Sequence, residues 1–231
     1  THIFEPGANP PAADVAHAVT TAGYDDHEAL KAFARACDIV TFEFENIPTE
    51  ALDVVEAITS IRPGREALRI SQDRLTEKTF LGDLGLKVAP FADVIDAATL
   101  KAAVAQIGTP AILKTRRFGY DGKGQARLKD DADLDAAWAE MNGAPSVLEG
   151  FVNFSAEISV IAARSATGEV ACFDPGENVH RDGILHTTTV PAKISNAQRT
   201  DAVLLAGRVL NALEYVGVMG VELFVTPQGL I

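Results

Sequence analysis

Basic side chains and glycines are concentrated in one stretch of this 231-residue sequence, residues 114–125, which read KTRRFGYDGKGQ. Its basic residues are Lys114, Arg116, Arg117 and Lys123, and its glycines are Gly119, Gly122 and Gly124. Glycine allows positive φ angles and close backbone approach, so several N–H groups can converge on phosphate oxygens. The stretch therefore predicts a polyphosphate site, although it has neither the Walker A spacing nor the GxGxxG fingerprint. The alternative is a solvated hairpin tip whose basic residues serve solubility.

Two carboxylates lie eight residues apart after the apolar run SVL, at Glu149 and Glu157. The backbone of residues 150–152 offers donors and acceptors that can pair with an adenine edge, and an acidic side chain can accept hydrogen bonds from ribose hydroxyls. The pattern suits a nucleotide site. The alternative is that both acids simply flank strands in contact with solvent.

A third acid, Glu222, interrupts the apolar run VGVMGVELFV and shares one face of the expected strand with Gly220. Charged groups are rarely buried without a partner, and Mg²⁺ is commonly held by one or two carboxylates together with substrate phosphates. Glu222 is thus a candidate metal ligand, with a salt-bridged core acid as the alternative. His180 and Arg74 stand as single polar residues, for which a surface role is the default expectation.

The elements that position these residues differ between the two parts of the chain. Residues 26–37 have the spacing of a helix, residues 38–45 (DIVTFEFE) alternate like a strand, and Asn46-Ile47-Pro48 opens another helix. Ile3 and Phe4 fit the end of a first strand. Residues 1 to about 60 are therefore expected to form a partial, doubly wound α/β layer.

The pattern changes from about residue 74, where helices alternate with pairs of strands. Helices are expected around residues 100–107 and 131–141 and after Ser195, which forms a capping box with Gln198. Strands are expected at PAILKT, GQARL, SVLEGFV, EISVIAA, EVACFD and VGVMGVELFV. Three of these runs follow one another without a helix, which predicts antiparallel sheets in an α+β domain.

Composition excludes several classes of partner. The net charge is −12 and the isoelectric point is about 4.8, which argues against electrostatic binding to nucleic acid or to an anionic membrane. Cys37 and Cys172 lack zinc-site spacing and favour a reducing cytosol. No run of about 18 apolar residues and no signal-peptide pattern is found, so a soluble, unprocessed, cytoplasmic protein is expected.

Taken together, the chain resembles ATP-grasp enzymes, and among them the 5-(carboxyamino)imidazole ribonucleotide synthase family of purine biosynthesis. The resemblance covers nearly all of the sequence through the motifs TFEFENIP (41–48), QDRLTEK (72–78), LKTRRFGYDGKGQ (113–125), LEGFVNFSAEISV (148–160), NVHRDGIL (178–185) and YVGVMGVELFVTPQG (215–229). GYDGKGQ beside an EFEN segment is specific within the superfamily.

The resemblance implies a fold, cofactors and partners. It implies a partial pre-ATP-grasp domain at residues 1–72 and an ATP-grasp domain at residues 73–231 whose lid covers about 85–150. ATP, Mg²⁺, 5-aminoimidazole ribonucleotide and bicarbonate would be bound, and a homodimer is expected. In the family reaction ATP phosphorylates bicarbonate to carboxyphosphate, and the CO₂ released from it carboxylates the aminoimidazole amine.

The resemblance also assigns roles to residues at matching positions. Arg74 and Lys114 would meet the nucleotide phosphates, Glu157 the ribose, His180 would border the nucleotide, and Glu222 would be the first magnesium glutamate. The loop that closes over the phosphates would be Gly119, Tyr120, Asp121, Gly122, Lys123, Gly124 and Gln125. The adenine would be read by Glu149, Gly150, Phe151 and Val152. The residues facing the aminoimidazole substrate, and so the candidate catalytic residues, would be Lys123, Tyr120 and Glu45.

The sequence also departs from the family pattern. A glycine-rich first strand, a second metal glutamate and a downstream basic segment have no counterpart in it. The expectation is a synthase as parent protein and little or no activity in these 231 residues taken alone. The alternatives are another ATP-grasp carboxylate ligase, such as a formate-using glycinamide ribonucleotide transformylase or a biotin-dependent carboxylase subunit, and a non-catalytic ATP-binding fragment.

Overall fold

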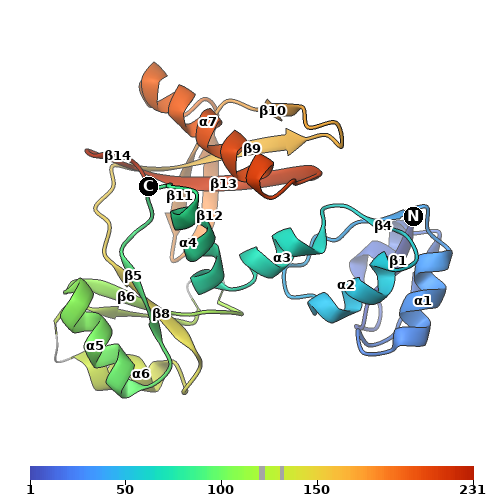
Figure 1. Ribbon diagram of the computed structural model, residues 1–231, viewed down its shortest axis with the longest axis horizontal. Coiled ribbons are helices and arrows are strands. Elements are labelled where there is room, and N and C mark those ends of the chain that lie inside the picture. Colours follow the sequence, from blue (N-terminus) through green and yellow to red (C-terminus); the bar gives the residue numbers. More distant parts are fainter. Residues whose placement is uncertain (120–122, 131–132) are drawn as a thin grey trace. The chain divides into compact units, whose positions relative to one another are not determined.

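A computed structural model describes residues 1–119, 123–130 and 133–231 (Figure 1). The chain divides into two compact units, Thr1–Arg69 and Ile70–Ile231, which are described separately below. The helix α3 (Arg65–Ser71) contains the boundary between them. Within the described residues, no helix has both the length and the apolar character needed to cross a membrane.

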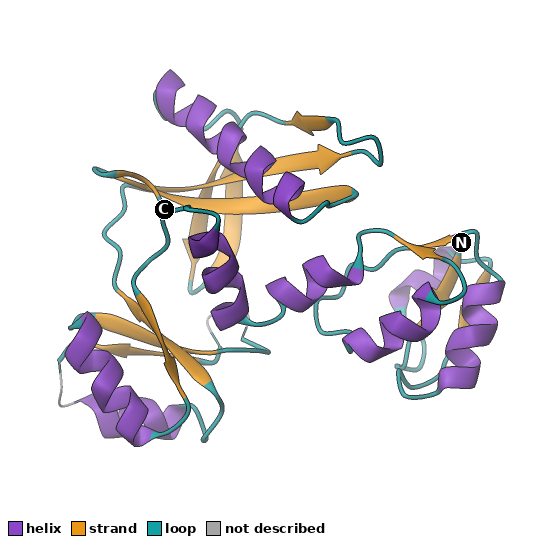
Figure 2. Cartoon of the chain, viewed as in Figure 1, coloured by secondary structure: helices purple, strands orange, loops and turns teal. Residues whose placement is uncertain are grey.

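The first unit combines short parallel strands with helices, as Figure 2 shows. Its elements are β1 (His2–Phe4), the 3₁₀ helix η1 (Pro11–Val15), β2 (Ala18–Thr20), α1 (His27–Arg35), β3 (Ile39–Val40), α2 (Thr49–Glu56) and β4 (Ser60–Ile61). Strand β1 pairs in parallel with β2, and β3 pairs in parallel with β4. The expected α/β character of this part is confirmed.

The helix α1 is formed where the sequence predicts it. The side chain of Asp26 caps it by accepting a hydrogen bond from the Ala29 N–H at 3.0 Å. Leu30, Phe33 and Ala34 form its buried face.

The strand expected at residues 38–45 is shorter than predicted, because only Ile39 and Val40 pair with β4. After β4 the chain reaches Pro63, which has no N–H to extend the ladder.

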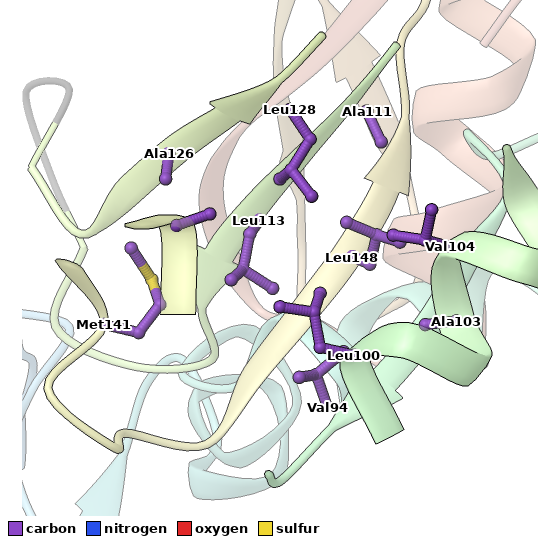
Figure 3. Close-up of a cluster of buried hydrophobic side chains, with 11 residues drawn as sticks. Val94, Leu100, Ala103, Val104, Ala111, Leu113, Ala126, Leu128, Met141 and Leu148 are labelled. Atoms are coloured by element: carbon purple, nitrogen blue, oxygen red, sulfur yellow. The ribbon is translucent and has the colours of Figure 1, made fainter. Parts of the chain in front are cut away.

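The second unit contains a four-stranded antiparallel sheet in the order β5-β8-β6-β7, covered by helices α5 and α6. Its elements are β5 (Phe91–Val94), α5 (Ala97–Ile107), β6 (Ala111–Thr115), β7 (Gln125–Leu128), α6 (Leu134–Glu140) and β8 (Ser146–Gly150). Alternate strand residues face the helices and form the core drawn in Figure 3, which includes Val94, Leu100, Leu113, Leu128, Met141 and Leu148. Each leucine buried in this way stabilises the fold by roughly 1.5–3 kcal/mol. Leu113 and Leu148 are paired and belong to this core, so the residues next to them on β6 and β8, which include Lys114 and Glu149, point to the opposite face.

A larger, six-stranded sheet has the order β12-β11-β9-β13-β14, with β10 also paired to β9. Its elements are β9 (Ala156–Arg164), β10 (Val170–Cys172), β11 (Gly176–Arg181), β12 (Ile184–Thr189), α7 (Asn196–Ala212), β13 (Gly217–Thr226) and β14 (Gly229–Leu230). All of its pairings are antiparallel, which confirms the antiparallel sheets predicted for this part of the chain.

The helix α7 begins with the predicted capping box, in which Ser195 and Gln198 exchange hydrogen bonds. Its buried residues are Ala202, Ala206, Val209 and Leu210, whereas Val203 and Leu213 are only partly covered. One further helix, α4 (Arg74–Asp83), begins the second unit and carries two of the basic residues considered next.

Candidate functional site

A buried carboxylate on β8 holds two ammonium groups. Glu149 has a side chain that is 8% exposed, and its Oε2 accepts a hydrogen bond from Lys114 Nζ at 2.9 Å. Its other oxygen, Oε1, lies 3.2 Å from Lys78 Nζ. Burial by itself raises the pKa of Glu149, but the charges of Lys114 and Lys78 outweigh it and hold that pKa below its usual value. Two cations sharing one anion leave a local excess of positive charge.

The strand that carries Lys114 leads directly into the glycine-rich stretch. Lys114 is paired with Gln125 at the start of β7, and Thr115 N–H donates to the Gly124 carbonyl at 2.8 Å. These two contacts close the base of the loop. Lys123 is described and exposed, whereas Tyr120, Asp121 and Gly122 lie outside the described residues, so their predicted roles are not examined by the structure.

The glycines at the base of this loop are needed for steric reasons. A Cβ added at Gly119 would lie 3.1 Å from Thr115 Oγ1 and 3.2 Å from the Lys123 carbonyl oxygen. Gly124 has a φ of +67°, and a Cβ there would lie 2.5 Å from Thr115 Oγ1. The base of the loop is therefore too narrow for side chains, as expected for a backbone that cradles a ligand.

Arg74 is the first residue of α4 and reaches this same base. Its guanidinium Nη2 donates to the Gly119 carbonyl oxygen at 3.2 Å. Lys78 follows one helical turn later, so both cations project from one side of α4. The sequence-based interpretation assigned Arg74 but missed Lys78. The i, i+4 spacing after Arg74 in QDRLTEK was the signal that could have identified it.

The segment expected to read adenine is partly engaged inside the protein. Gly150 N–H donates to the Pro90 carbonyl at 2.8 Å, and Phe151 N–H donates to the Pro110 carbonyl at 3.1 Å. Val152 N–H has no protein partner among the described residues, and it is the donor left for a ligand in this segment. The role of residues 149–152 in adenine binding stays a prediction.

The face of the six-stranded sheet away from α7 carries the other acids. On β9, Ile158, Val160 and Ala162 are fully buried, so the alternate residues Glu157 and Ser159 lie on the opposite face. The register of β13 places Glu222 opposite Ser159, and the register of β11 places Asn178 opposite Glu157. Polar side chains from three adjacent strands are thus brought together on one face.

Hydrogen bonds and ring contacts order this polar face. His180 Nδ1 lies 3.5 Å from Glu157 Oε2, and Asn178 Oδ1 accepts from Thr188 Oγ1 at 2.8 Å. Phe224, two residues after the exposed Glu222, stacks on Phe154 with ring centroids 4.4 Å apart. Asn178 was not identified from the sequence, where an asparagine in a strand gives no distinctive signal.

The electrostatics of Glu157 connect the two sheets of the second unit. Burial raises the pKa of Glu157, the electrostatic interaction with His180 opposes that rise, Glu222 adds to it and Lys114 opposes it. The net effect is a pKa above the usual value. Lys114 and Glu222 therefore both lie within electrostatic range of Glu157.

This arrangement is suited to a cation that is shared with a ligand. No group of three or more histidine, cysteine or acidic side chains that would hold a metal alone is found in the described ranges. Glu222 is exposed next to the partly buried Glu157, and the two negative charges disfavour each other. A Mg²⁺ ion typically takes one or two carboxylates plus phosphate oxygens, which fits this donor set.

Glu45, the remaining predicted residue, lies in the first unit, where it is exposed in the segment between β3 and α2. Its assignment to the aminoimidazole substrate remains a prediction. The other described candidates all lie in the second unit.

Comparisons with known proteins agree with this geometry. A family model described as an ATP-grasp domain matches residues 79–231, and one described as a ribonucleotide synthetase preATP-grasp domain matches residues 1–72. The N5-carboxyaminoimidazole ribonucleotide synthase of Brucella melitensis is 51% identical over an alignment of 231 positions that covers 99% of this chain and 64% of that protein.

Solved structures give the same result. The chain matches the crystal structure of an ADP complex of an N5-carboxyaminoimidazole ribonucleotide synthetase with a TM-score of 0.94 and 39% identity, covering 99% of this chain and 60% of that one. It matches the Aspergillus clavatus synthase in complex with ADP and 5-aminoimidazole ribonucleotide with a TM-score of 0.90 and 27% identity, covering 100% and 61%. The chain spans less than two thirds of the length of each of these relatives. The resemblance predicted from the sequence is confirmed: the chain belongs to the ATP-grasp family and carries a ribonucleotide synthetase preATP-grasp domain before its ATP-grasp domain.

Proposed function

We propose that this chain is the nucleotide-binding part of an ATP-dependent ligase that carboxylates 5-aminoimidazole ribonucleotide with bicarbonate. The proposal rests on the site in the second unit and on the relatives, one of which is solved with ADP and 5-aminoimidazole ribonucleotide. The products would be N5-carboxyaminoimidazole ribonucleotide, ADP and phosphate.

One observation supports this function above the others: Lys114 and Lys78 lie 2.9 and 3.2 Å from the buried carboxylate of Glu149, beside the narrow base of the glycine-rich loop. The charge of Lys114 also opposes the rise in the pKa of Glu157, which supports a single site shared by the cations of the smaller sheet and the acids of the larger sheet. A triphosphate placed between them would meet cations along its phosphates and carboxylates beside its ribose and its metal. A solvated hairpin tip would not require this convergence.

The chemistry suits such a site. A bicarbonate oxygen attacks the γ-phosphorus of ATP, the bond to ADP breaks, and carboxyphosphate forms. Carboxyphosphate then releases phosphate and CO₂, and the substrate amine attacks CO₂ and loses a proton to give the N-carboxy product. Bringing anions together in this way depends on positioning and on charge stabilisation, which Arg74, Lys78 and Lys114 supply on the phosphate side.

Glu222, with Glu157 beside it, would hold Mg²⁺ together with the phosphates. When bound, Mg²⁺ neutralises charge on the transferring phosphoryl group. Lys123, Tyr120 and Glu45 are proposed to face the aminoimidazole substrate. A homodimer in the cytoplasm completes the proposal.

The test measures ADP release by the protein at its full natural length. ADP release that requires both 5-aminoimidazole ribonucleotide and bicarbonate is the expected result. Release stimulated instead by formate with glycinamide ribonucleotide, or by biotin, would assign a different ATP-grasp ligase. Tight Mg·ATP binding without turnover on any of these acceptors would contradict the enzymatic role and indicate a nucleotide-binding module.

A further inference from the structure

The residues just before and at the start of α4 bind the strand that rises into the glycine-rich loop. Asp73, which precedes α4, accepts hydrogen bonds from Arg116 Nε at 3.1 and 3.0 Å, and Arg116 Nη2 lies 2.8 Å from Asp73 Oδ2. The side chain of Arg116 is only 25% exposed and that of Asp73 only 17%. A bidentate ion pair that is largely buried keeps its geometry better than an exposed ion pair.

Asp73 serves the helix at the same time. Its Oδ1 accepts hydrogen bonds from the N–H groups of Leu75 at 3.0 Å and Thr76 at 3.2 Å, so it is the N-cap of α4. Burial raises the pKa of Asp73, but the hydrogen bonds from Arg116 and from these N–H groups outweigh it and lower that pKa below the usual value. One charged side chain therefore caps α4 and binds Arg116, whose Nη1 also lies 3.4 Å from the more exposed Asp93 Oδ1.

The neighbours of Asp73 repeat the connection. Gln72 is buried, and its Oε1 accepts a hydrogen bond from Arg117 Nη2 at 2.9 Å. Arg74 N–H donates to the Arg116 carbonyl at 3.0 Å, in addition to the contact of its guanidinium with Gly119. Three successive residues, 72 to 74, thus hold residues 116, 117 and 119.

The carboxylate of Asp73 lies next to the phosphate site but faces Arg116 rather than a ligand. We propose that Asp73, through Arg116, is a positioning residue that fixes the base of the glycine-rich loop on α4, so that Arg74, Lys78 and Lys114 point to one phosphate-binding location. The inference deepens the proposed function and rests on it. Cationic side chains that already hold their binding positions lose less conformational entropy when a polyphosphate binds.

The test separates positioning from folding with Asp73→Asn. Asparagine keeps the side-chain oxygen that caps a helix but loses the charge that holds Arg116. Calorimetry should show Mg·ADP binding weakened about tenfold, since charge-assisted hydrogen bonds would be lost from the base of the loop. Adenosine, measured by competition, should bind within about twofold of its wild-type affinity, because the contacts affected serve the phosphates.

The matched control is Glu66→Gln, which neutralises an exposed carboxylate that also binds an arginine, Arg69, at 2.6 Å. It should change Mg·ADP affinity by less than about twofold. The double variant Asp73→Asn/Arg116→Gln should bind Mg·ADP no more weakly than the weaker single variant, because both changes break the same pair.

Three outcomes would overturn the inference. Unchanged Mg·ADP affinity in Asp73→Asn would refute it and leave the proposed function intact. Equal loss of adenosine and Mg·ADP affinity would assign Asp73 a purely structural role. Failure of the wild-type protein to bind Mg·ADP would refute the nucleotide function itself, and the inference with it.

Discussion

Lys114 and Glu149 form an ion pair across the antiparallel strands β6 and β8, with Nζ and Oε2 2.9 Å apart. The register places Ile112 opposite Glu149, so Lys114 is the diagonal neighbour on the same face of the sheet. This face is opposite to the one that packs on α5 and α6. The pairing therefore anchors a basic side chain on a rigid strand and directs it away from the core.

Replacing Lys114 by methionine should weaken Mg·ADP binding roughly 100-fold, because the proposed phosphate ligand is lost and Glu149 keeps only Lys78 as partner. Calorimetry measures the affinity. Lys129→Met is the matched control, since Lys129 is an exposed lysine after β7 and should leave the affinity unchanged. Equal effects of the two changes would contradict a specific role for Lys114.

Glu149→Gln should lower stability in a pH-dependent way. The folded-state pKa of Glu149 is below its usual value, so its charge stabilises the fold above the unfolded-state pKa of about 4.3. That contribution is lost as the pH falls from there through the folded-state pKa. Thermal unfolding of both proteins should show a large difference at pH 7 that shrinks in acid. A difference that does not depend on pH would exclude the ion pairs as its cause.

Much of the second unit follows from the sequence because periodicity reports local structure. The apolar positions of β6 and of α5, and the Ser195–Gln198 capping box, required only neighbouring residues to be recognised. The glycines next to Lys114 marked the loop for the same reason. Features that depend on a residue distant in the sequence were harder to predict from the sequence.

The sequence shows the i, i+4 spacing of Arg74 and Lys78 but not the ion pair of Lys78 with Glu149, because that pair forms only when β8 brings Glu149 next to α4. The hydrogen bonds of the Gly150 and Phe151 N–H groups depend on the carbonyl groups of Pro90 and Pro110, which lie 60 and 41 residues earlier in the chain. The length of β3 was overestimated since pairing stops where its partner strand stops. Each of these features is decided by tertiary contacts rather than by local propensity.

Glu222→Gln should make the ligand-free protein more stable at neutral and alkaline pH. Burial and the charge of Glu222 both raise the pKa of Glu157, so the ionised Glu157 destabilises the fold as the pH rises through its folded-state pKa. Removing the charge of Glu222 should relieve part of the destabilisation caused by ionised Glu157. Thermal unfolding against pH should show the gain, and an NMR titration should show a lower pKa for Glu157.

The same change should remove the benefit of Mg²⁺ for ADP binding, because the exposed carboxylate proposed as its ligand is gone. Glu169→Gln is the control, as Glu169 is an exposed acid before β10 on the same unit. Increased stability with an unchanged Mg²⁺ effect on ADP affinity would show that Glu222 is not a metal ligand. Unchanged stability and an unshifted Glu157 would contradict the electrostatic interpretation.

Gly124→Ala should damage both stability and nucleotide binding, and Gly143→Ala should damage stability alone. Both glycines have positive φ, +67° and +71°, so alanine costs each about 1–2 kcal/mol of backbone strain. Only at Gly124 would the new Cβ also meet Thr115 Oγ1, at 2.5 Å, whereas nothing lies within 4 Å at Gly143. The clash should cost about 1–3 kcal/mol more and displace the base of the loop.

Chemical denaturation measures the loss of stability and Mg·ADP calorimetry measures the loss of affinity. Adding Thr115→Ala to Gly124→Ala should recover part of both. Equal losses of stability and affinity in the two alanine variants would mean that backbone strain alone, and not the narrow base of the loop, decides the outcome.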